Sequence, residues 1–167
     1  MVRSLLHALM ARVGERVSGG SDRRIAVFVD GDGISAHHAD LVLQHLAQSH
    51  HICTIRVFGN ITSRNVSAWS HVIKLQGIVM RHTPSLVEGK NAADIALAID
   101  ALEFHLTRPV PSYAVLTSDA DFTPLVLRLK ESAASVEGFG HKTTPANFRR
   151  VCTTFTQISN IKCGKDT

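Results

Sequence analysis

The feature that most constrains this chain is a regular alternation of short apolar runs with helical patterns from about residue 24 to residue 158. The runs 25–29 and 113–117 are nearly continuous in apolar residues, and each is followed by a stretch with helical spacing. Strands that alternate with helices form βαβ units, whose parallel strands are buried on both faces and therefore have continuous apolar sequences. The chain is therefore predicted to be an α/β domain with a mostly parallel sheet.

The pattern predicts five strands and five helices within this domain. The expected strands cover 25–29, 52–58, 78–81, 113–117 and 135–138, and the expected helices cover 36–48, 64–75, 91–106, 122–133 and a stretch after Pro145. In the helix 91–106, Ile95, Ile99, Leu102 and Leu106 recur on one face. We interpret this apolar stripe as part of the core.

One domain is expected, because 167 residues with 44% hydrophobic and 19% charged residues suit a single packed core. We assign the domain to residues 23–160, with 161–167 as a tail. Residues 1–22 are predicted to form a short amphipathic helix, with Leu5, Leu6, Leu9 and Val13 on one face, and a flexible linker. This arm is a candidate contact for a protein partner or for a second copy of the chain.

Charge and cysteine content indicate the kind of partner and the setting. A formal net charge of +4 and a pI near 9.3 favour polyanionic partners. The three cysteines (Cys53, Cys152 and Cys163) are too far apart for a disulfide framework or a CxxC zinc site, which favours a cytoplasmic protein. No apolar run approaches the roughly 20 residues of a membrane span, so no membrane partner is expected. An Arg-rich, acid-poor start also fits an organelle transit peptide.

Acidic residues cluster where an α/β sheet places its ligands, beyond the carboxyl ends of strands that meet at a switch point. Asp30 and Asp32 follow the first predicted strand, Asp119 and Asp121 follow the fourth, and Asp94 lies at the start of a helix. Converging carboxylates repel one another until a cation neutralises them. Oxygen ligands without nearby cysteine favour Mg²⁺ or Mn²⁺ over Zn²⁺. Taken singly, each motif also fits a turn or a helix cap.

Four blocks of the chain resemble the successive motifs of bacterial NYN domains, which belong to the PIN-like ribonuclease superfamily. The most specific are Lys90-Asn91-Ala92-Ala93-Asp94 and Ser118-Asp119-Ala120-Asp121-Phe122. The blocks are Val27–Ile34, Lys90–Asp100, Thr117–Leu125 and Val136–Gly140. The resemblance implies a PIN-like Rossmannoid fold with strand order 3-2-1-4-5 and metal-dependent endonuclease activity on RNA.

By position, the resemblance assigns the acidic site to Asp30, Asp94, Asp119 and Asp121, with Asp100 as a further recurrent acid. Gly33 stands where many members have Asn, and Asp32 is a candidate partial replacement. Loss of that amide is expected to weaken the site, because supporting groups commonly change metal affinity or activity by about 10- to 100-fold. The resemblance also implies hydrolysis by a metal-activated water that leaves 5′-phosphate and 3′-hydroxyl ends.

Contacts to RNA are expected at the phosphate backbone. The candidates are Lys90, Ser118, Arg56, Arg64, Lys142, Arg149 and Arg150. Aromatic residues make up only 5% of the chain, so a base-stacking platform is not indicated. The expected substrate is single-stranded RNA. The ten histidines lack zinc-ligand spacing, and we interpret His37, His38, His45, His50 and His51 as surface residues of helices and loops.

Two other functions remain open. The sequence Asp30-Gly31-Asp32-Gly33 also resembles the Asp-x-Asp motif of haloacid-dehalogenase-like phosphatases, with Asp30 as the nucleophile and Asp32 as the acid. The expected lysine before the later acidic motif is missing, however, because Lys90 introduces a helix instead. The second alternative is an RNA-binding or scaffolding domain that has lost activity. Gly33 favours this alternative, because it stands where many members of the family have Asn.

Overall fold

The structure, a computed structural model, describes residues 22–59, 68–70, 72, 78–82 and 91–161. The predicted arm up to residue 21 and the tail from residue 162 lie outside these residues. Of the predicted helix 64–75, residues 68–70 and 72 are described, and they are helical. No helix in the described part is long and apolar enough to cross a membrane.

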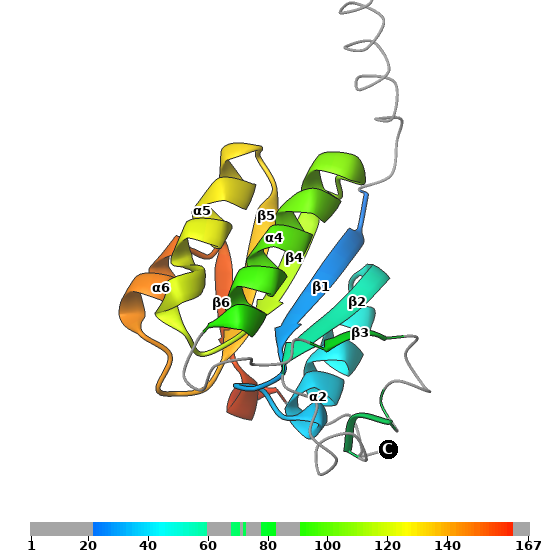
Figure 1. Cartoon of the computed structure of the whole chain (residues 1–167), viewed down its shortest axis with the longest axis vertical. Helices are drawn as coiled ribbons and strands as arrows, with labels where there is room; N and C mark the ends of the chain where they lie inside the picture. Colours follow the sequence, from blue (N-terminus) through cyan, green and yellow to red (C-terminus); the bar gives the residue numbers. More distant parts are fainter. Residues whose placement is uncertain (1–21, 60–67, 71, 73–77, 83–90, 162–167) are drawn as a thin grey trace, which may run out of the picture.

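A parallel sheet of six strands forms the centre of the protein, in the order β3-β2-β1-β4-β5-β6 (Figure 1). The strands are β1 (Arg24–Asp30), β2 (His51–Gly59), β3 (Val79–His82), β4 (Ser112–Leu116), β5 (Ser135–Gly140) and β6 (Thr154–Gln157). The predicted α/β class and the order 3-2-1-4-5 are confirmed. The prediction of five strands was one short, because β6 has the sequence Thr-Phe-Thr-Gln and carries no apolar run.

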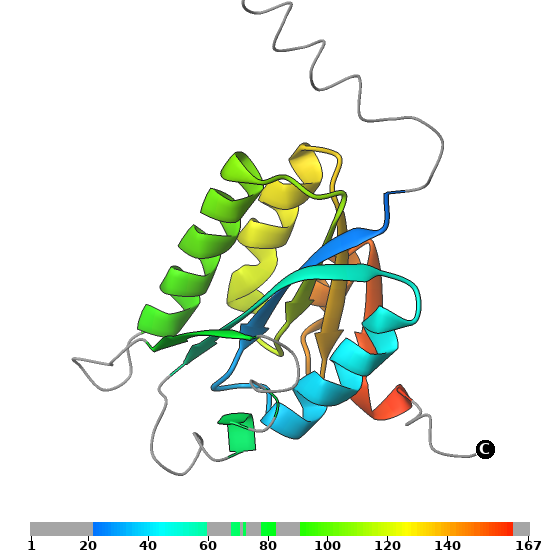
Figure 2. The same cartoon turned by 90° about the vertical axis from the view of Figure 1, so that its right-hand side faces the viewer.

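Helices cover both faces of the sheet, with α2 on one side and α4, α5 and α6 on the other (Figures 1 and 2). The helices are α2 (Ala36–Ala47), α4 (Ala92–Thr107), α5 (Thr123–Glu131) and α6 (Ala146–Val151), with short 3₁₀ turns η1 (Ala120–Phe122) and η2 (Ile158–Asn160). Ser35 begins α2 by accepting a hydrogen bond from the His38 amide, as expected of a helix cap. The result is a three-layer fold.

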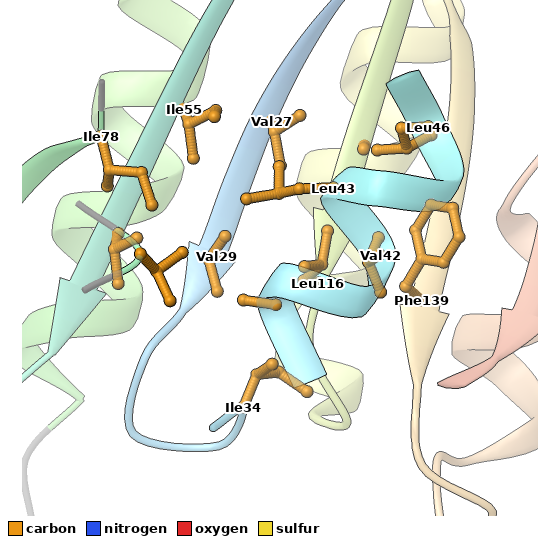
Figure 3. Packing of buried hydrophobic residues seen from close by; sticks show 14 of the residues in the cluster. Val27, Val29, Ile34, Val42, Leu43, Leu46, Ile55, Ile78, Leu116 and Phe139 are labelled. Carbon is orange, nitrogen blue, oxygen red and sulfur yellow. The ribbon is translucent and has the colours of Figure 1, made fainter. Parts of the chain in front are cut away.

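Each layer interface has its own apolar core. Beneath α2, Val27, Val29, Leu43 and Phe139 pack together with Ile55 from β2 (Figure 3). On the opposite face, a second cluster joins the inner sides of α4, α5 and α6 to the sheet through fully buried residues such as Phe28, Tyr113 and Phe148. The central strands β2, β1, β4 and β5 contribute side chains to both clusters, so the two cores are joined through the sheet.

The orientation of α4 differs from the prediction. Ile95, Ile99 and Leu106 face solvent with exposed fractions of 60, 61 and 75%, and the interpretation of their stripe as core was wrong. The residues that α4 buries against the sheet are Leu97, Ala101 and Phe104, while Leu102 is half-buried. Since α4 carries apolar residues on several faces, its sequence periodicity alone does not select the buried face.

The strand order reverses between β1 and β4. From β1 the chain proceeds to β2 and β3, and α4 then carries it back across β1 to β4 and on towards β6. Neighbouring connections therefore diverge at the carboxyl ends of β1 and β4. This is the switch point at which α/β sheets bind their ligands.

Candidate metal centre

A cavity of about 570 Å³ opens at this switch point. Acidic side chains from three separate segments line it: Asp30 and Asp32 after β1, Asp119 after β4, and Asp94 in the first turn of α4. Asn91, Gly33 and Ser118 also contribute to the wall. The fold therefore brings together three acidic motifs that are far apart in the sequence.

Asp30 is the most firmly held of these acids. Its Oδ1 accepts hydrogen bonds from the amides of Asp32 (3.2 Å) and Gly33 (3.0 Å), and its Oδ2 accepts one from the Thr117 hydroxyl (2.9 Å). Burial raises the pKa of Asp30, and these three hydrogen bonds oppose that rise. The carboxylate is therefore fixed in orientation before any ligand arrives.

Gly33 makes room for Asp30. A Cβ placed on Gly33 would lie 2.5 Å from Asp30 Oδ2, a separation that real Cβ atoms do not show. Any side chain at position 33, including the Asn found in many NYN domains, would require the Asp30 carboxylate to move. In this chain the observed orientation of the Asp30 carboxylate therefore requires glycine at position 33.

Asp119 and Asp121 lie in the turn after β4. The Asp119 carboxylate caps η1 by accepting a hydrogen bond from the Asp121 amide (2.8 Å), so the alternative interpretation of Asp119 as a helix cap describes a real contact. Asp121 receives a long hydrogen bond from the Asn91 side chain (3.5 Å). The Thr117 hydroxyl accepts from the Asp119 amide (3.0 Å) while it donates to Asp30, and so it links the two acidic turns.

The negative charge gathered at the cavity changes the pKa of Asp94. Its pKa is raised to about 6, first by burial and then by the negative charges of Asp30, Asp119, Asp32 and Asp121. Asn91, which precedes α4, uses its side chain on Asp121 and makes no capping hydrogen bond to the helix. The five acids therefore form one repelling group, as expected from the sequence.

The donor chemistry of the cavity fits a hard divalent cation. Its side-chain donors are carboxylate, amide and hydroxyl oxygens, and no Cys or His is among the described residues that line it. As the described side chains are placed, no group of three or more His, Cys, Asp or Glu is arranged to hold an ion directly. An ion in this open site would retain water ligands, as Mg²⁺ commonly does with one or two carboxylates.

Asp100 lies apart from this cavity. Its carboxylate forms an ion pair with Arg56 (2.6 Å) and lies 3.8 Å from Arg81, while the Arg56 guanidinium stacks over Phe104. These groups connect the side of α4 to β2 and β3. The structure thus gives Asp100 and Arg56 a structural contact rather than a place in the acidic group.

The predicted RNA contacts fall into two sets. Lys142 and Arg150 are exposed, whereas Arg149 donates to the carbonyls of Thr144 (2.7 Å) and Lys142 and stacks over Phe155. Ser118 accepts from the His141 amide (3.0 Å) and from Thr144 (3.2 Å), although it also lines the cavity. Lys90 and Arg64 lie outside the described residues.

Two features were missed at the sequence level. Thr117 is fully buried and links Asp30 to Asp119; its position at the strand end, directly before Ser118-Asp119, was the available signal. His38 was interpreted as a surface residue, but it is half-buried, its ring packs 5.0 Å from that of His141, and its Nδ1 has no partner among the described residues. Burial lowers the pKa of His38, as do the neighbouring His141 and His37.

The His38 and His141 rings help to line a second cavity of about 360 Å³, which shares Asp32 and Gly33 with the first.

The fold defines the class as an α/β domain with a parallel sheet and a cavity at its switch point, and the family match below identifies it as a PIN-like, nuclease-type fold. Residues 24–159 match the NYN domain family, and the chain belongs to this family. No curated protein matches the chain.

Among solved structures, a Vibrio parahaemolyticus protein of unknown function is similar over 86% of this chain and 98% of its own, with a TM-score of 0.71 and 16% identity. Acinetobacter baumannii MurG is similar over 81% of this chain but only 41% of its own, with a TM-score of 0.51 and 16% identity. Both likenesses concern the fold alone.

Proposed function

We propose that this NYN domain is a metal-dependent endoribonuclease that hydrolyses phosphodiester bonds of single-stranded RNA in the cytoplasm. The observation that carries the proposal is the convergence of four carboxylates, those of Asp30, Asp32, Asp94 and Asp119, on one cavity. Burial, followed by the negative charges of these neighbours and of Asp121, raises the pKa of Asp94 to about 6. A protein tolerates such repulsion at a cost in stability, and perturbed acids in a cavity are typical of functional sites. Mg²⁺ or Mn²⁺ is the cofactor that this donor set suits.

Four aspartates would hold the metal ion. Asp30 and Asp119 are the principal ligands, and Asp94 and Asp121 bind directly or through water. A bound ion lowers the pKa of its water and neutralises charge that develops on the phosphate. Asp30 enters this arrangement already oriented by two amides and the Thr117 hydroxyl, which limits the reorganisation that binding requires.

RNA would reach the cavity past exposed cations. Lys142 and Arg150 are solvent-exposed on the segment that follows β5, and Ser118 lies in the cavity wall. Contacts of this kind are to phosphate and carry little sequence preference. The proposed substrate is therefore a class of RNA rather than one sequence.

The test is cleavage of an end-labelled single-stranded RNA by the purified chain with Mn²⁺, with Mg²⁺ and with a chelator, followed by analysis of the product ends. We expect metal-dependent cleavage that leaves 5′-phosphate and 3′-hydroxyl ends. Asp30→Asn should retain the fold and RNA binding but lower the cleavage rate by more than about 100-fold, since loss of a supporting group alone costs up to that much. Glu131→Gln, an exposed acid on α5 that pairs with Arg128, is the matched control and should cleave normally.

Other outcomes would identify the alternatives. RNA binding without cleavage in any metal would indicate a binding or scaffolding domain. Metal-dependent phosphatase activity, with a beryllofluoride adduct on Asp30, would indicate the haloacid-dehalogenase-like chemistry. Against the latter, no lysine is among the described residues that line the cavity.

A further inference from the structure

The outward face of α4 is an apolar surface without a described partner. Ile95, Ile99 and Leu106 are largely exposed, and half-buried Leu102 lies between them along the helix. In the part of the chain that the structure describes, the exposed large hydrophobic residues are Val79, Ile95, Ile99, Leu106 and Leu127, so three of the five lie on this one face. The stripe extends for about 16 Å at 1.5 Å per residue. Such a contiguous exposed patch marks an interaction surface.

We propose that residues 2–13 of this same chain pack as a helix along the outward face of α4, parallel to it. The apolar residues of α4 are separated by four, three and four positions, from Ile95 to Leu106. Val2, Leu6, Leu9 and Val13 have the same separations in the same order. Two parallel helices with this spacing pack their apolar residues at matching levels, as in a coiled coil. The register places Leu6 beside Ile99 and Val13 beside Leu106.

Charge favours the same pairing. The exposed acid Glu103 lies beside this face of α4, and the helix contains no Lys or Arg. The other two acids of α4 are engaged elsewhere, Asp94 in the acidic cavity and Asp100 with Arg56. The segment 2–17 carries Arg3, Arg12 and Arg16 against the single acid Glu15. Opposite charges on two surfaces favour their association and suppress competing partners. A second copy of α4 is a poorer partner, because it would bring another Glu103 and no Lys or Arg to this face.

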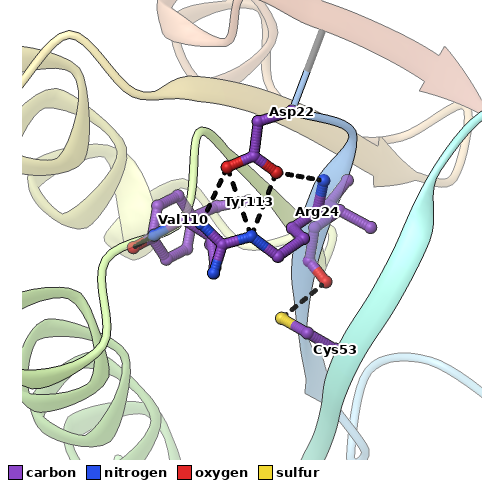
Figure 4. A network of polar contacts seen from close by, with 6 residues as sticks. Asp22, Arg24, Cys53, Val110 and Tyr113 are labelled. Carbon is purple, nitrogen blue, oxygen red and sulfur yellow. Dashed lines mark hydrogen bonds and ion pairs between the residues drawn. The ribbon is translucent and has the colours of Figure 1, made fainter. Parts of the chain in front are cut away.

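The connection is short enough for the segment to fold back onto its own chain. β1 begins beside the end of α4, where His105 Nδ1 lies 2.8 Å from the Tyr113 hydroxyl and Ala26 pairs with Tyr113. Asp22 is tied to this edge through Arg24 (2.7 Å), as Figure 4 shows. Residues 14–21 can span up to about 27 Å when extended. They suffice to join Asp22 to a helix that ends at the level of Leu106.

Cross-linking of the intact chain tests the register. In a background with Cys53→Ser and Cys163→Ser, Leu6→Cys with Ile99→Cys should oxidise to an intramolecular disulfide in dilute solution. Leu6→Cys with Leu106→Cys is the matched control and should not, because seven residues along α4 add about 10 Å and a disulfide needs Cα atoms within about 7 Å. Equal cross-linking of both pairs, absence of cross-linking in both, or covalent dimers from the first pair would each overturn the proposal.

A proteolysis experiment provides the second measurement. Docking should protect the bonds after Arg3 and Arg12 from trypsin, and Ile99→Glu should speed cleavage there by about tenfold or more. Leu127→Glu changes an exposed apolar residue on α5 and should leave the cleavage rate unchanged. Both substituted residues are exposed, so circular dichroism should show a retained fold. Identical cleavage rates for the two variants and the parent chain would contradict docking on α4. The result does not depend on nuclease activity.

Discussion

Two aspartates of α4, Asp94 and Asp100, have opposite electrostatic surroundings although they lie on the same helix. Asp94 is surrounded by four other carboxylates, and its pKa is raised to about 6, whereas Asp100 forms a 2.6 Å ion pair with Arg56 and lies near Arg81. Asp100 thus has counter-charges within the protein, whereas no cation pairs with Asp94 among the described residues. The comparison teaches that a charge left unbalanced by its own fold is the better indicator of a functional site. In the proposed function a bound cation would supply the counter-charge of Asp94, whereas Asp100 ties α4 to Arg56 on β2.

The largest expected effect is the stabilisation of the fold by added metal, which should bind at the acidic cavity beside Asp94 and not at Asp100. At a free Mg²⁺ or Mn²⁺ concentration about 100 times the dissociation constant, binding should stabilise the fold by about 2.7 kcal/mol. For a chain of this size, that corresponds to a rise in melting temperature of about 5–10 °C. Asp119→Asn should reduce the rise, and Glu131→Gln should not. An equal rise in both variants, measured by differential scanning fluorimetry, would place the ion elsewhere.

Replacing the two aspartates should change stability in opposite directions. Asp100→Asn leaves the half-buried Arg56 without its counter-charge and should lower the free energy of unfolding by about 1.5–3 kcal/mol. Asp94→Asn removes repulsion and should stabilise the metal-free protein by on the order of 1 kcal/mol at pH 7.5, allowing for solvent screening. Urea unfolding in chelator would measure both. Destabilisation by Asp94→Asn would contradict the assignment of repulsion to this acid.

The pH dependence follows from Asp94. Its pKa in the folded protein, about 6, lies above the ordinary value of 3.8, so the folded state binds this proton more readily than the unfolded state. The stability that Asp94 costs above pH 6 should therefore be recovered as the pH falls from about 7 towards 4. The difference in unfolding free energy between the parent chain and Asp94→Asn, measured in chelator, should shrink over this range. Other groups, His38 included, largely cancel in that difference. A constant difference would refute the raised pKa.

The smallest expected effect concerns RNA binding. Arg150 is exposed, whereas the guanidinium of Arg149 is already engaged with two carbonyls and Phe155. Arg150→Ala should therefore flatten the dependence of log affinity on log salt by about 0.7, the value for one phosphate contact on a single strand. Arg149→Ala should act mainly through stability, because Arg149 ties α6 to the carbonyls of Lys142 and Thr144 in the preceding segment. Fluorescence anisotropy at several salt concentrations would measure the slopes, and equal loss of slope in both variants would refute this division.

The class of fold and the convergence of acidic motifs were accessible to sequence analysis, because both depend on signals that are strong locally. Continuous apolar runs fix buried parallel strands, and their order places the residues after β1 and β4 at one edge of the sheet. The edge strand β6 was missed because four residues with one aromatic carry little signal. The role of Thr117 was missed because it depends on a hydrogen bond to Asp30, 87 residues away in the sequence.

The buried face of α4 was wrongly predicted for a different physical reason. Leu97, Ala101 and Phe104 form one apolar face, and Ile95, Ile99 and Leu106 form another. Periodicity identifies a helix from either set but cannot choose between two apolar faces. The choice depends on partners that are distant in sequence, such as Arg56 on β2, which no local pattern records.

The ion pair between Asp100 and Arg56 therefore does more than join α4 to β2. A helix with apolar residues on two sides gains from directional polar contacts that are satisfied in one rotation about its axis. The ion pair supplies one such contact, and the contact between His105 and Tyr113 at the far end supplies another. Asp94 lies six residues before Asp100, about 120° round the same axis. The rotation of α4 in which Asp100 reaches Arg56 is therefore also the one in which Asp94 lines the acidic cavity.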